Sequence, residues 1–356
     1  MRHENSVNLA RIDEFDEIVD VRSPAEFALD HVPGAVNCAV LENEERARVG
    51  TIYKQVSSFE ARKLGAALVA RNVARHLETH FAARDPGWKP LIYCWRGGKR
   101  SESMAHILRE IGWHATTLEG GYQSYRRELL LQLEELPQRF DYHVVCGPTG
   151  SGKSRLLQVL ASEGAQVLDL EALARHRGSV LGDLPGDPQP TQKMFDSLIW
   201  NALRRFDPAF PVFIEAESRK VGVVRLPPKL LQQMTSSRCV RIDAPIAERV
   251  RFLLLEYRHL LADTDWLKQK LLRLTGLHSR ETVARWTTQI DGADWEALVH
   301  DLLVTHYDPA YRRSLTNLYP ALAQATAIET DRLDDMRLAA VARGLLKRDQ
   351  VTAADG

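Results

Sequence analysis

The stretch "DYHVVCGPTGSGKSRLLQVLASEG", residues 141–164, places a glycine-rich loop between an apolar run and an amphipathic segment. Gly147, Gly152, Lys153 and Ser154 satisfy the spacing Gly-x4-Gly-Lys-Ser, and the flanking runs predict a strand before the loop and a helix after it. In that setting backbone N–H groups ring a phosphate, the lysine neutralises its outer oxygens, and the serine can hold magnesium. A chance match in a glycine-rich turn would lack these flanks. The predicted phosphate- or diphosphate-binding residues are Gly147, Pro148, Thr149, Gly150, Ser151, Gly152, Lys153 and Ser154.

Three apolar runs after this loop, within residues 165–173, 210–222 and 237–245, predict further strands of an α/β domain. The first is expected to end near Asp169 and Glu171, and the second at Glu215 and Glu217. In sheets of this type ligands lie at the carboxyl ends of the strands. The side chains that follow those ends are therefore candidates for the same site: Asp169, Glu215, Glu217, Arg219 and Lys220. Glu215 or Glu217 is the expected acidic partner of magnesium. The competing interpretation for each carboxylate is a solvated strand end.

Residues 174–195 form a long predicted loop between the second strand and the next helix. Loops of this length in compact domains are usually functional or disordered. His176, Arg177 and Ser179 are therefore candidates for contact with substrate, and Gln192 is a weaker one.

A second motif, "LIYCWRGGKRS" at residues 91–101, places a cysteine where a buried strand turns into a helix. Two glycines let successive N–H groups point inward, and the helix N-terminus adds positive potential. Such surroundings lower the pKa of a thiol and favour the nucleophilic thiolate, so Cys94 is the predicted catalytic residue. The alternative is a buried core cysteine. The predicted anion cradle consists of Trp95, Arg96, Gly97, Gly98, Lys99, Arg100 and Ser101.

The segments on either side of this motif resemble a rhodanese domain. "IVDVRSPAEFALDHVPGAVNCAVL", residues 18–41, is similar to the entry strand and helix of that family, and "LEGGYQSYRR", residues 118–127, to its closing strand and turn. The resemblance implies that Cys94 carries sulfur or selenium as a persulfide or perselenide. One departure is that the usual loop runs Cys-x-x-Gly-x-Arg, whereas here five residues separate Cys94 from Arg100. Loops of that length occur in phosphatase relatives of the fold, which leaves phosphate chemistry open. The positions on the family pattern are Asp20, Arg22, Glu26, His31, Pro33, Gly34 and Ala35.

At 356 residues the chain is long enough for two domains with cores of their own. We predict an α/β protein with a rhodanese-like domain over residues 1–137 and a P-loop NTPase-like domain with a helical C-terminal part over residues 138–356, joined by a helix over 128–140. Cys38, Cys146 and Cys239 lie in apolar runs without metal-ligand spacing, and we expect them in cores. The sequence has no apolar targeting segment and no run of about 18 apolar residues, so we expect a cytoplasmic protein without a membrane span.

After residue 245 the apolar spacing becomes helical. Residues 267–286 are rich in cations, with tryptophans at the flanks, which is typical of a surface that binds nucleic-acid backbone. The candidates for contact with nucleic acid are Lys268, Lys270, Arg273, Arg280 and Arg285. Because the formal net charge of the chain is zero, a solvated helix face is an equally good explanation.

A rhodanese-like domain followed by a P-loop domain, with "EAESRKVG" at 215–222 and "HYDPAY" at 306–311, resembles the tRNA 2-selenouridine synthase family over nearly the whole chain. That family implies a transferase that replaces the sulfur of 2-thiouridine at the tRNA wobble position by selenium. It also implies selenophosphate as the donor, an S-geranyl intermediate made from geranyl diphosphate, and selenophosphate synthetase as the expected supplier. Magnesium is expected through Ser154, and a requirement for ATP is doubtful.

Three other classes of protein stay open on the sequence. An ATP-dependent RNA or small-molecule kinase with a rhodanese domain would hydrolyse ATP saturably. A plain thiosulfate sulfurtransferase would not need its second domain. A non-enzymatic tRNA-binding module would be unaffected by Cys94→Ser.

Overall fold

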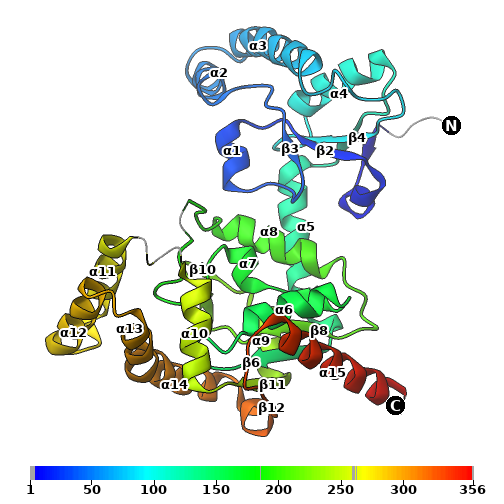
Figure 1. The fold of residues 1–356 in the computed structure, drawn as a ribbon. Coiled ribbons are helices and arrows are strands. Elements are labelled where there is room, and N and C mark those ends of the chain that lie inside the picture. The colour runs from blue at the N-terminus through cyan, green and yellow to red at the C-terminus, as the bar shows by residue number, and fades with distance from the viewer. Residues whose placement is uncertain (1–4, 185, 259–260, 262, 355–356) are drawn as a thin grey trace. The chain divides into compact units, whose positions relative to one another are not determined.

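The computed structural model describes residues 5–184, 186–258, 261 and 263–354 (Figure 1). Contacts divide the chain into two compact units. Unit 1 consists of Met1–Gln132 with Asp196–Asn201, and unit 2 of Leu133–Phe195 with Ala202–Gly356. The predicted domain boundary between residues 137 and 138 falls within the short 3-10 helix η2 (Leu136–Arg139).

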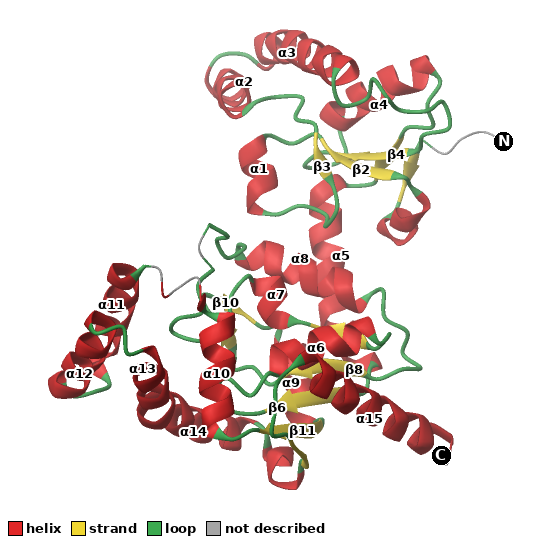
Figure 2. Cartoon of the chain, viewed as in Figure 1, coloured by secondary structure: helices red, strands yellow, loops and turns green. Residues whose placement is uncertain are grey.

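Unit 1 is built on a five-stranded parallel sheet in the order β1-β5-β4-β2-β3. Its strands are β1 (Ser6–Val7), β2 (Glu17–Asp20), β3 (Val36–Asn37), β4 (Pro90–Tyr93) and β5 (Thr116–Leu118). Its helices are η1 (Leu9–Glu14), α1 (Pro24–Leu29), α2 (Asn43–Gln55), α3 (Ser58–Glu78), α4 (Lys99–Ile111) and α5 (Gly121–Glu135). Figure 2 shows α3 and α4 on one side of this sheet, where Val73, Met104 and Leu108 pack against Val19 and Ile92.

Unit 2 contains a second five-stranded parallel sheet, in the order β12-β11-β6-β8-β7. Its strands are β6 (Tyr142–Cys146), β7 (Gln166–Leu168), β8 (Val212–Glu215), β11 (Arg238–Asp243) and β12 (Thr326–Glu329), and β9 (Lys220–Val221) pairs antiparallel with β10 (Val224–Arg225). The helices around it are α6 (Lys153–Ser162), α7 (Leu170–Ala174), α8 (Gln192–Leu203), α9 (Pro228–Ser236), η6 (Pro320–Gln324) and α15 (Asp335–Ala354).

The central strand β6 determines where the glycine-rich loop lies. All five of its residues are buried, because strands flank it on both sides and helices cover the sheet. On one face Leu156, Leu157 and Leu160 of α6 pack against Leu338 and Ala342 of α15. The loop between β6 and α6 therefore leaves the middle of the sheet at its carboxyl edge, where ligands of parallel sheets bind.

A helical region follows β11 and has a small core of its own. It comprises α10 (Ile246–Glu256), α11 (Thr264–Leu272), η4 (Arg273–Gly276), α12 (Arg280–Asp291), α13 (Trp295–Leu302), the π-helix η5 (Leu303–Tyr307) and α14 (Asp308–Leu318). The core centres on the fully buried Trp286 and includes Leu267, Leu271, Leu298 and Leu302.

The predicted α/β class is confirmed, and Cys38, Cys146 and Cys239 are buried as expected. The strand predicted to end near Asp169 and Glu171 is β7, which ends at Leu168; the Asp169 side chain then accepts the Ala172 N–H and caps α7. One detail of the prediction was wrong. The region after residue 245 is not wholly helical, because β12 adds an edge strand parallel to β11.

Within the described residues, none of the helices combines the length and apolar character that crossing a membrane would require.

Candidate functional site

The glycine-rich loop has the backbone that its sequence predicts. Gly147, Gly150 and Gly152 have φ angles of 155°, 79° and 81°, a region that residues with side chains rarely adopt, and α6 begins at Lys153. A Cβ atom added to Gly150 would lie 2.8 Å from Cδ1 of Leu253 in α10. The loop therefore packs against a leucine of α10 on one side and leads into α6 on the other.

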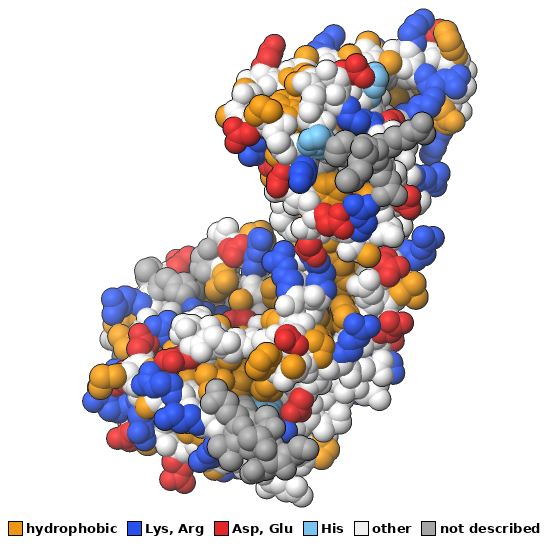
Figure 3. Space-filling view, turned by 90° about the vertical axis from the view of Figure 1, so that its right-hand side faces the viewer, with side chains coloured by type: hydrophobic (Ala, Val, Ile, Leu, Met, Phe, Trp, Pro, Cys, Tyr) orange, Lys and Arg blue, Asp and Glu red, His pale blue; other side chains and the backbone are white. Residues whose placement is uncertain are grey.

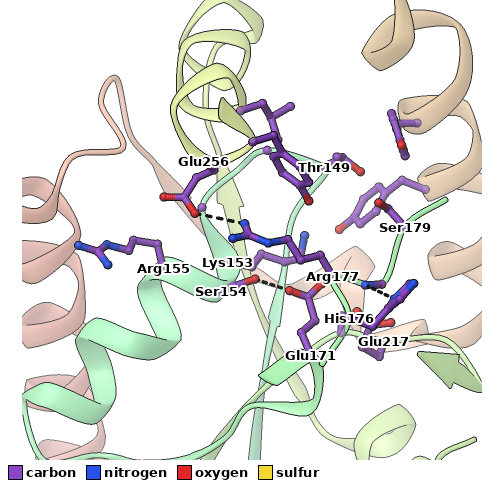
Figure 4. A pocket seen from close by; sticks show the side chains of 18 of the residues that line it. Thr149, Lys153, Ser154, Arg155, Glu171, His176, Arg177, Ser179, Glu217 and Glu256 are labelled. Atoms are coloured by element: carbon purple, nitrogen blue, oxygen red, sulfur yellow. Dashed lines mark hydrogen bonds and ion pairs between the residues drawn. The ribbon is translucent and has the colours of Figure 1, made fainter. Parts of the chain in front are cut away.

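A cavity of about 480 Å³ opens beside this loop (Figure 4). It brings together predicted residues from three separate stretches of sequence: the loop itself, the segment after β7 and the end of β8. The predicted residues in its lining are Thr149, Gly150, Gly152, Lys153, Ser154, Asp169, His176, Arg177, Ser179 and Glu217. Glu215, Arg219, Lys220 and Gln192 do not line it, and Gln192 instead bonds the backbone of Arg225.

Buried carboxylates form the acidic side of the cavity. The Ser154 hydroxyl donates to Glu171 Oε2 at 2.7 Å, and the Glu171 N–H donates to Glu215 Oε1 at 2.7 Å. Glu215 therefore fixes the backbone of Glu171 through this hydrogen bond and does not itself line the cavity. Burial, followed by the negative charges of Asp169 and Glu171, raises the pKa of Glu215 well above its ordinary value. Burial and the charge of Glu171 raise the pKa of Glu217 to about 8.

Two cations face these acids, and both are engaged with groups of the protein. Lys153 Nζ donates to the carbonyl oxygen of Gly147 at 2.8 Å, so the loop lysine folds back on its own loop. Arg177 pairs with Glu256 at 3.2 Å and lies over the ring of Tyr257 at 4.9 Å. Figure 4 shows the side chains of Arg177, Glu171 and Ser154 close together beside the first turn of α6.

The segment "HYDPAY" braces the loop and closes the cavity. His306, Tyr307 and Tyr311 line the cavity, and Asp308 binds both terminal nitrogens of Arg249, which is 5% exposed. Arg249 in turn donates from Nε to the carbonyl oxygen of Thr149 at 2.9 Å. This chain of contacts holds the phosphate loop to α10 and α14.

The oxygen atoms beside the loop suit magnesium held partly by a substrate. Mg²⁺ usually keeps several waters and takes one or two carboxylates together with phosphate oxygens. Ser154 and Glu171, 2.7 Å apart, offer a hydroxyl and a carboxylate in that arrangement. The described residues contain no group of three or more His, Cys, Asp or Glu side chains that would hold a metal ion without a substrate.

The thiol of Cys94 lies at the floor of the second predicted site, in unit 1. Its sulfur accepts hydrogen bonds from the Gly98 N–H and the Ser101 hydroxyl, each at 3.2 Å. Burial opposes ionisation, but these bonds and the N–H groups of Ser101 and Arg96 outweigh it and lower the pKa of Cys94. Gly97 has a φ of 62°, and a Cβ there would lie 2.7 Å from the Leu118 carbonyl oxygen. The loop thus encircles the sulfur with donors, as the sequence predicts.

The cations of this cradle are less free than the sequence suggests. Arg100 pairs with Glu26 at 3.1 Å, and Arg96 Nε donates to Gln123 at 3.1 Å. Trp95 stacks on Tyr122 with ring centroids 5.2 Å apart. The donors nearest the sulfur are therefore backbone N–H groups and Ser101, with the guanidinium of Arg100 held in position by Glu26.

The cationic segment proposed for tRNA is largely paired with acids of the same unit. Lys268 contacts Asp291, Lys270 contacts Asp183, and Arg285 pairs with Asp301. Lys270 is also buried. On the face shown in Figure 3, basic and acidic side chains are interspersed, in keeping with the zero net charge.

Several residues of the cavity were not proposed as site residues from the sequence: Glu171, Glu256, Tyr257, His306, Tyr307 and Tyr311. The sequence held a signal for Glu171, since it stands three residues after the end of β7 and two after the capping Asp169. Tyr257 offered none, because an apolar helix places aromatic residues in ordinary cores far more often than in sites.

Comparison with known proteins adds family relationships to this geometry. Residues 6–128 match the model of the rhodanese-like domain, and residues 140–270 match the model of the tRNA 2-selenouridine synthase AAA domain. The chain is 38% identical over 246 residues to a tRNA 2-selenouridine synthase of Nitrosomonas europaea, a match covering 67% of this chain and 63% of that protein. A relative of the same name from Bdellovibrio bacteriovorus is 37% identical, with 65% of this chain and 62% of the relative covered.

A third relative, the tRNA 2-selenouridine synthase of Alcanivorax borkumensis, is 33% identical over 326 residues, a match that covers 83% of this chain and 88% of the relative. The matches to the Nitrosomonas and Bdellovibrio proteins, in contrast, span less than two thirds of the length of those proteins.

Proposed function

Because the chain belongs to the tRNA 2-selenouridine synthase family, we propose that it replaces sulfur by selenium in wobble 2-thiouridine of tRNA. The observation that carries the proposal is the presence of two anion sites with different chemistry in one chain. One has the Cys94 thiol at its floor, and the other has Lys153 in a phosphate loop. An exchange of sulfur for selenium that needs a nucleophile for the selenium donor and a binding site for the diphosphate of the geranyl donor would use both anion sites.

The first step is alkylation of the sulfur by geranyl diphosphate. The thiocarbonyl sulfur attacks C1 of the geranyl group, the C–O bond to diphosphate breaks, and N3 of the base loses its proton. Loop N–H groups and Lys153 stabilise the charge that develops on the departing diphosphate. Lys153 must first leave the carbonyl oxygen of Gly147. Magnesium, held by Ser154 and Glu171, would neutralise part of the same charge when bound.

The second step exchanges geranylthiol for selenium. Selenophosphate, water and the S-geranyl nucleoside give 2-selenouridine, geranylthiol and phosphate, and selenium stays at the oxidation level of selenide throughout. A perselenide on Cys94 would need a reductant before it could deliver selenide. Attack of the Cys94 thiolate on phosphorus needs none, because the P–Se bond breaks with its electron pair on selenium, and water then cleaves the S–P bond. The five-residue spacing from Cys94 to Arg100 favours this route, since it is the spacing of phosphatase relatives of the fold.

The test is to supply each purified variant with thiolated tRNA and with tRNA that is already geranylated, and to identify the wobble nucleoside by mass spectrometry. Lys153→Ala should stop geranylation, with a loss of roughly 10²–10³-fold as for other lost transition-state donors, yet still selenate the geranylated tRNA. Cys94→Ser should accumulate the S-geranyl nucleoside and make no selenouridine.

Loss of geranylation in Lys153→Ala and loss of selenation in Cys94→Ser would assign one step to each site. Normal geranylation by Lys153→Ala, or full selenation by Cys94→Ser, would contradict the assignment. An obligatory requirement for ATP in the first step would favour the kinase-like class, because the same loop binds nucleotide phosphates.

A further inference from the structure

A second, apolar cavity opens from the phosphate-binding cavity of unit 2. The two share five lining residues: Thr149, Ser179, Leu253, Tyr257 and Tyr307. Beyond this shared mouth the apolar cavity is lined by aliphatic side chains of α10, α11, α13, η5 and the segment after α7, including Leu181, Leu254, Leu267, Leu298, Leu302 and Leu303. A ligand whose phosphates lie on the glycine-rich loop would therefore meet hydrocarbon directly beside its head group.

The polar groups at the mouth are already engaged. The Tyr307 side chain interacts with Ser179, and Tyr257 lies under the guanidinium of Arg177. Leu267, Leu298 and Leu302 are between 2% and 4% exposed. They line the apolar cavity and not the phosphate-binding cavity. A nucleotide base in this space would leave its N–H groups and ring nitrogens without partners, which is costly, whereas an alkyl chain would not.

We propose that this cavity binds the hydrocarbon tail of a prenyl diphosphate and that Leu298 and Leu302 determine the length of chain it accepts. The inference rests on the proposed diphosphate role of the loop and adds to it a site for the tail. Leu253 links the two parts, because it contacts Gly150 of the loop and also lines the apolar wall. Discrimination by a well-packed apolar pocket amounts to about tenfold or more for each methylene.

The first measurement is binding, which does not require turnover. Calorimetry should show that wild-type protein binds geranyl diphosphate at least about 100-fold more tightly than inorganic diphosphate, because the tail adds buried apolar surface. Leu302→Trp should fill the cavity and remove most of that difference while leaving the affinity for inorganic diphosphate unchanged. Unchanged diphosphate affinity shows that the variant is folded around its phosphate loop.

A matched pair of truncations tests chain length. Leu298 and Leu271 belong to the same buried core cluster, but only Leu298 lines the cavity. Leu298→Ala should shift the ratio of affinities from geranyl toward farnesyl diphosphate by at least about tenfold. Leu271→Ala removes the same atoms from the same core and should leave the ratio at the wild-type value.

The outcomes separate this inference from the proposed function. Equal affinity of the wild type for geranyl diphosphate and inorganic diphosphate would overturn the tail site, as would identical ligand preference in Leu298→Ala and Leu271→Ala. Tail-dependent binding without any transfer of geranyl to thiolated tRNA would preserve the tail site and overturn the geranylation step.

Discussion

The hydrogen bonds that lower the pKa of Cys94 come from atoms of its own loop. Ser101 is completely buried, and its hydroxyl contacts both the sulfur, at 3.2 Å, and the carbonyl oxygen of Gly98, at 3.0 Å. Arg100 of the cradle is paired with Glu26. A cysteine ionised by hydrogen bonds keeps its low pKa in high salt, where the effect of exposed cations is screened.

Ser101→Ala should therefore raise the pKa of Cys94. Burial opposes the charged form, and the variant loses the strongest of the hydrogen bonds that overcome it. The rate of iodoacetamide alkylation of the Cys94 peptide, followed against pH by mass spectrometry, should move its midpoint to higher pH.

Ser103→Ala is the control, since Ser103 lies on the same helix and bonds only the carbonyl oxygen of Lys99 among the described contacts. An equal shift in both variants would show that the helix, rather than the Ser101 hydroxyl, sets the pKa.

The buried acid Glu217 predicts an unusual pH dependence of stability. Its pKa is raised from an ordinary 4.5 to about 8 by burial and by Glu171, so the folded state binds more protons than the unfolded state between these values. The free energy of unfolding should fall as pH rises from 4.5 to 8, by up to about 5 kcal/mol.

Urea unfolding of unit 2 at a series of pH values measures this effect. Glu217→Gln, which keeps the shape without the charge, should flatten the curve. A decline of the same size in Glu217→Gln would assign the effect to other members of the acidic cluster.

The sequence predicts the residues of fixed spacing better than those brought in by packing. Lys153 and Ser154 follow from the motif alone, because a phosphate loop needs both at one place. Glu215 and Glu217 were equally good candidates, because residues two apart lie on the same face of a strand. The end of β8 at Glu215 separates them: Glu215 bonds the Glu171 N–H beneath the cavity, and Glu217, beyond the strand, lines it.

Among the elements, the π-helix η5 and α14 act as the brace of the phosphate loop. A π-turn places consecutive residues off the usual helical spacing, and here it lets both His306 and Tyr307 face the cavity while Asp308 reaches Arg249. The loop is therefore supported by a segment about 160 residues away in the sequence.

Arg249→Ala should weaken both stability and diphosphate binding. It leaves Asp308 largely buried without its cation, which typically costs about 3–5 kcal/mol, and removes the donor to Thr149. Urea denaturation and diphosphate calorimetry measure the two effects.

Arg251→Ala is the matched control on the same helix, because Arg251 is 51% exposed and Glu248, its salt-bridge partner, keeps a hydrogen bond from the Leu333 N–H without it. Its loss should change stability by less than about 1 kcal/mol. Similar losses for the two variants would mean that the brace contributes nothing beyond an ordinary surface pair.

The elements that escaped prediction are short and exposed. Strand β12 has three exposed residues of four, so no alternation or apolar run marks it, and only pairing with β11 makes it a strand. The capping role of Asp169 could have been predicted. An aspartate at the residue before a helix commonly accepts the N–H three residues later, as Asp169 accepts that of Ala172.

For the whole molecule, the balance of charge limits how the proposed tRNA substrate could bind. Because acidic and basic residues are equal in number, the protein has no overall positive potential to attract tRNA. Its affinity for tRNA must therefore come from a few cations without acidic partners. Among the described residues, Arg273 and Arg280 have no ion-pair partner, whereas Lys268, Lys270 and Arg285 have one each.

Arg273→Ala and Arg280→Ala should each lower the slope of log affinity for tRNA against log salt by about 1. Filter binding over a range of potassium chloride concentrations measures it. Lys270→Ala serves as the comparison, because its ammonium is buried against Asp183 and its loss should leave the slope unchanged. A slope that falls only in Lys270→Ala would reverse this ranking.

The discontinuity of unit 1 has a consequence for synthesis of the chain. Its first 132 residues are complete about 70 residues before Asp196–Asn201 leave the ribosome, and that short segment supplies the Ser197 hydroxyl to the buried Asp30 and the Trp200 ring to Tyr125. At roughly 5–20 residues per second the nascent unit waits several seconds with a buried carboxylate short of one donor. During that interval the growing polypeptide depends on chaperones more than a contiguous domain would.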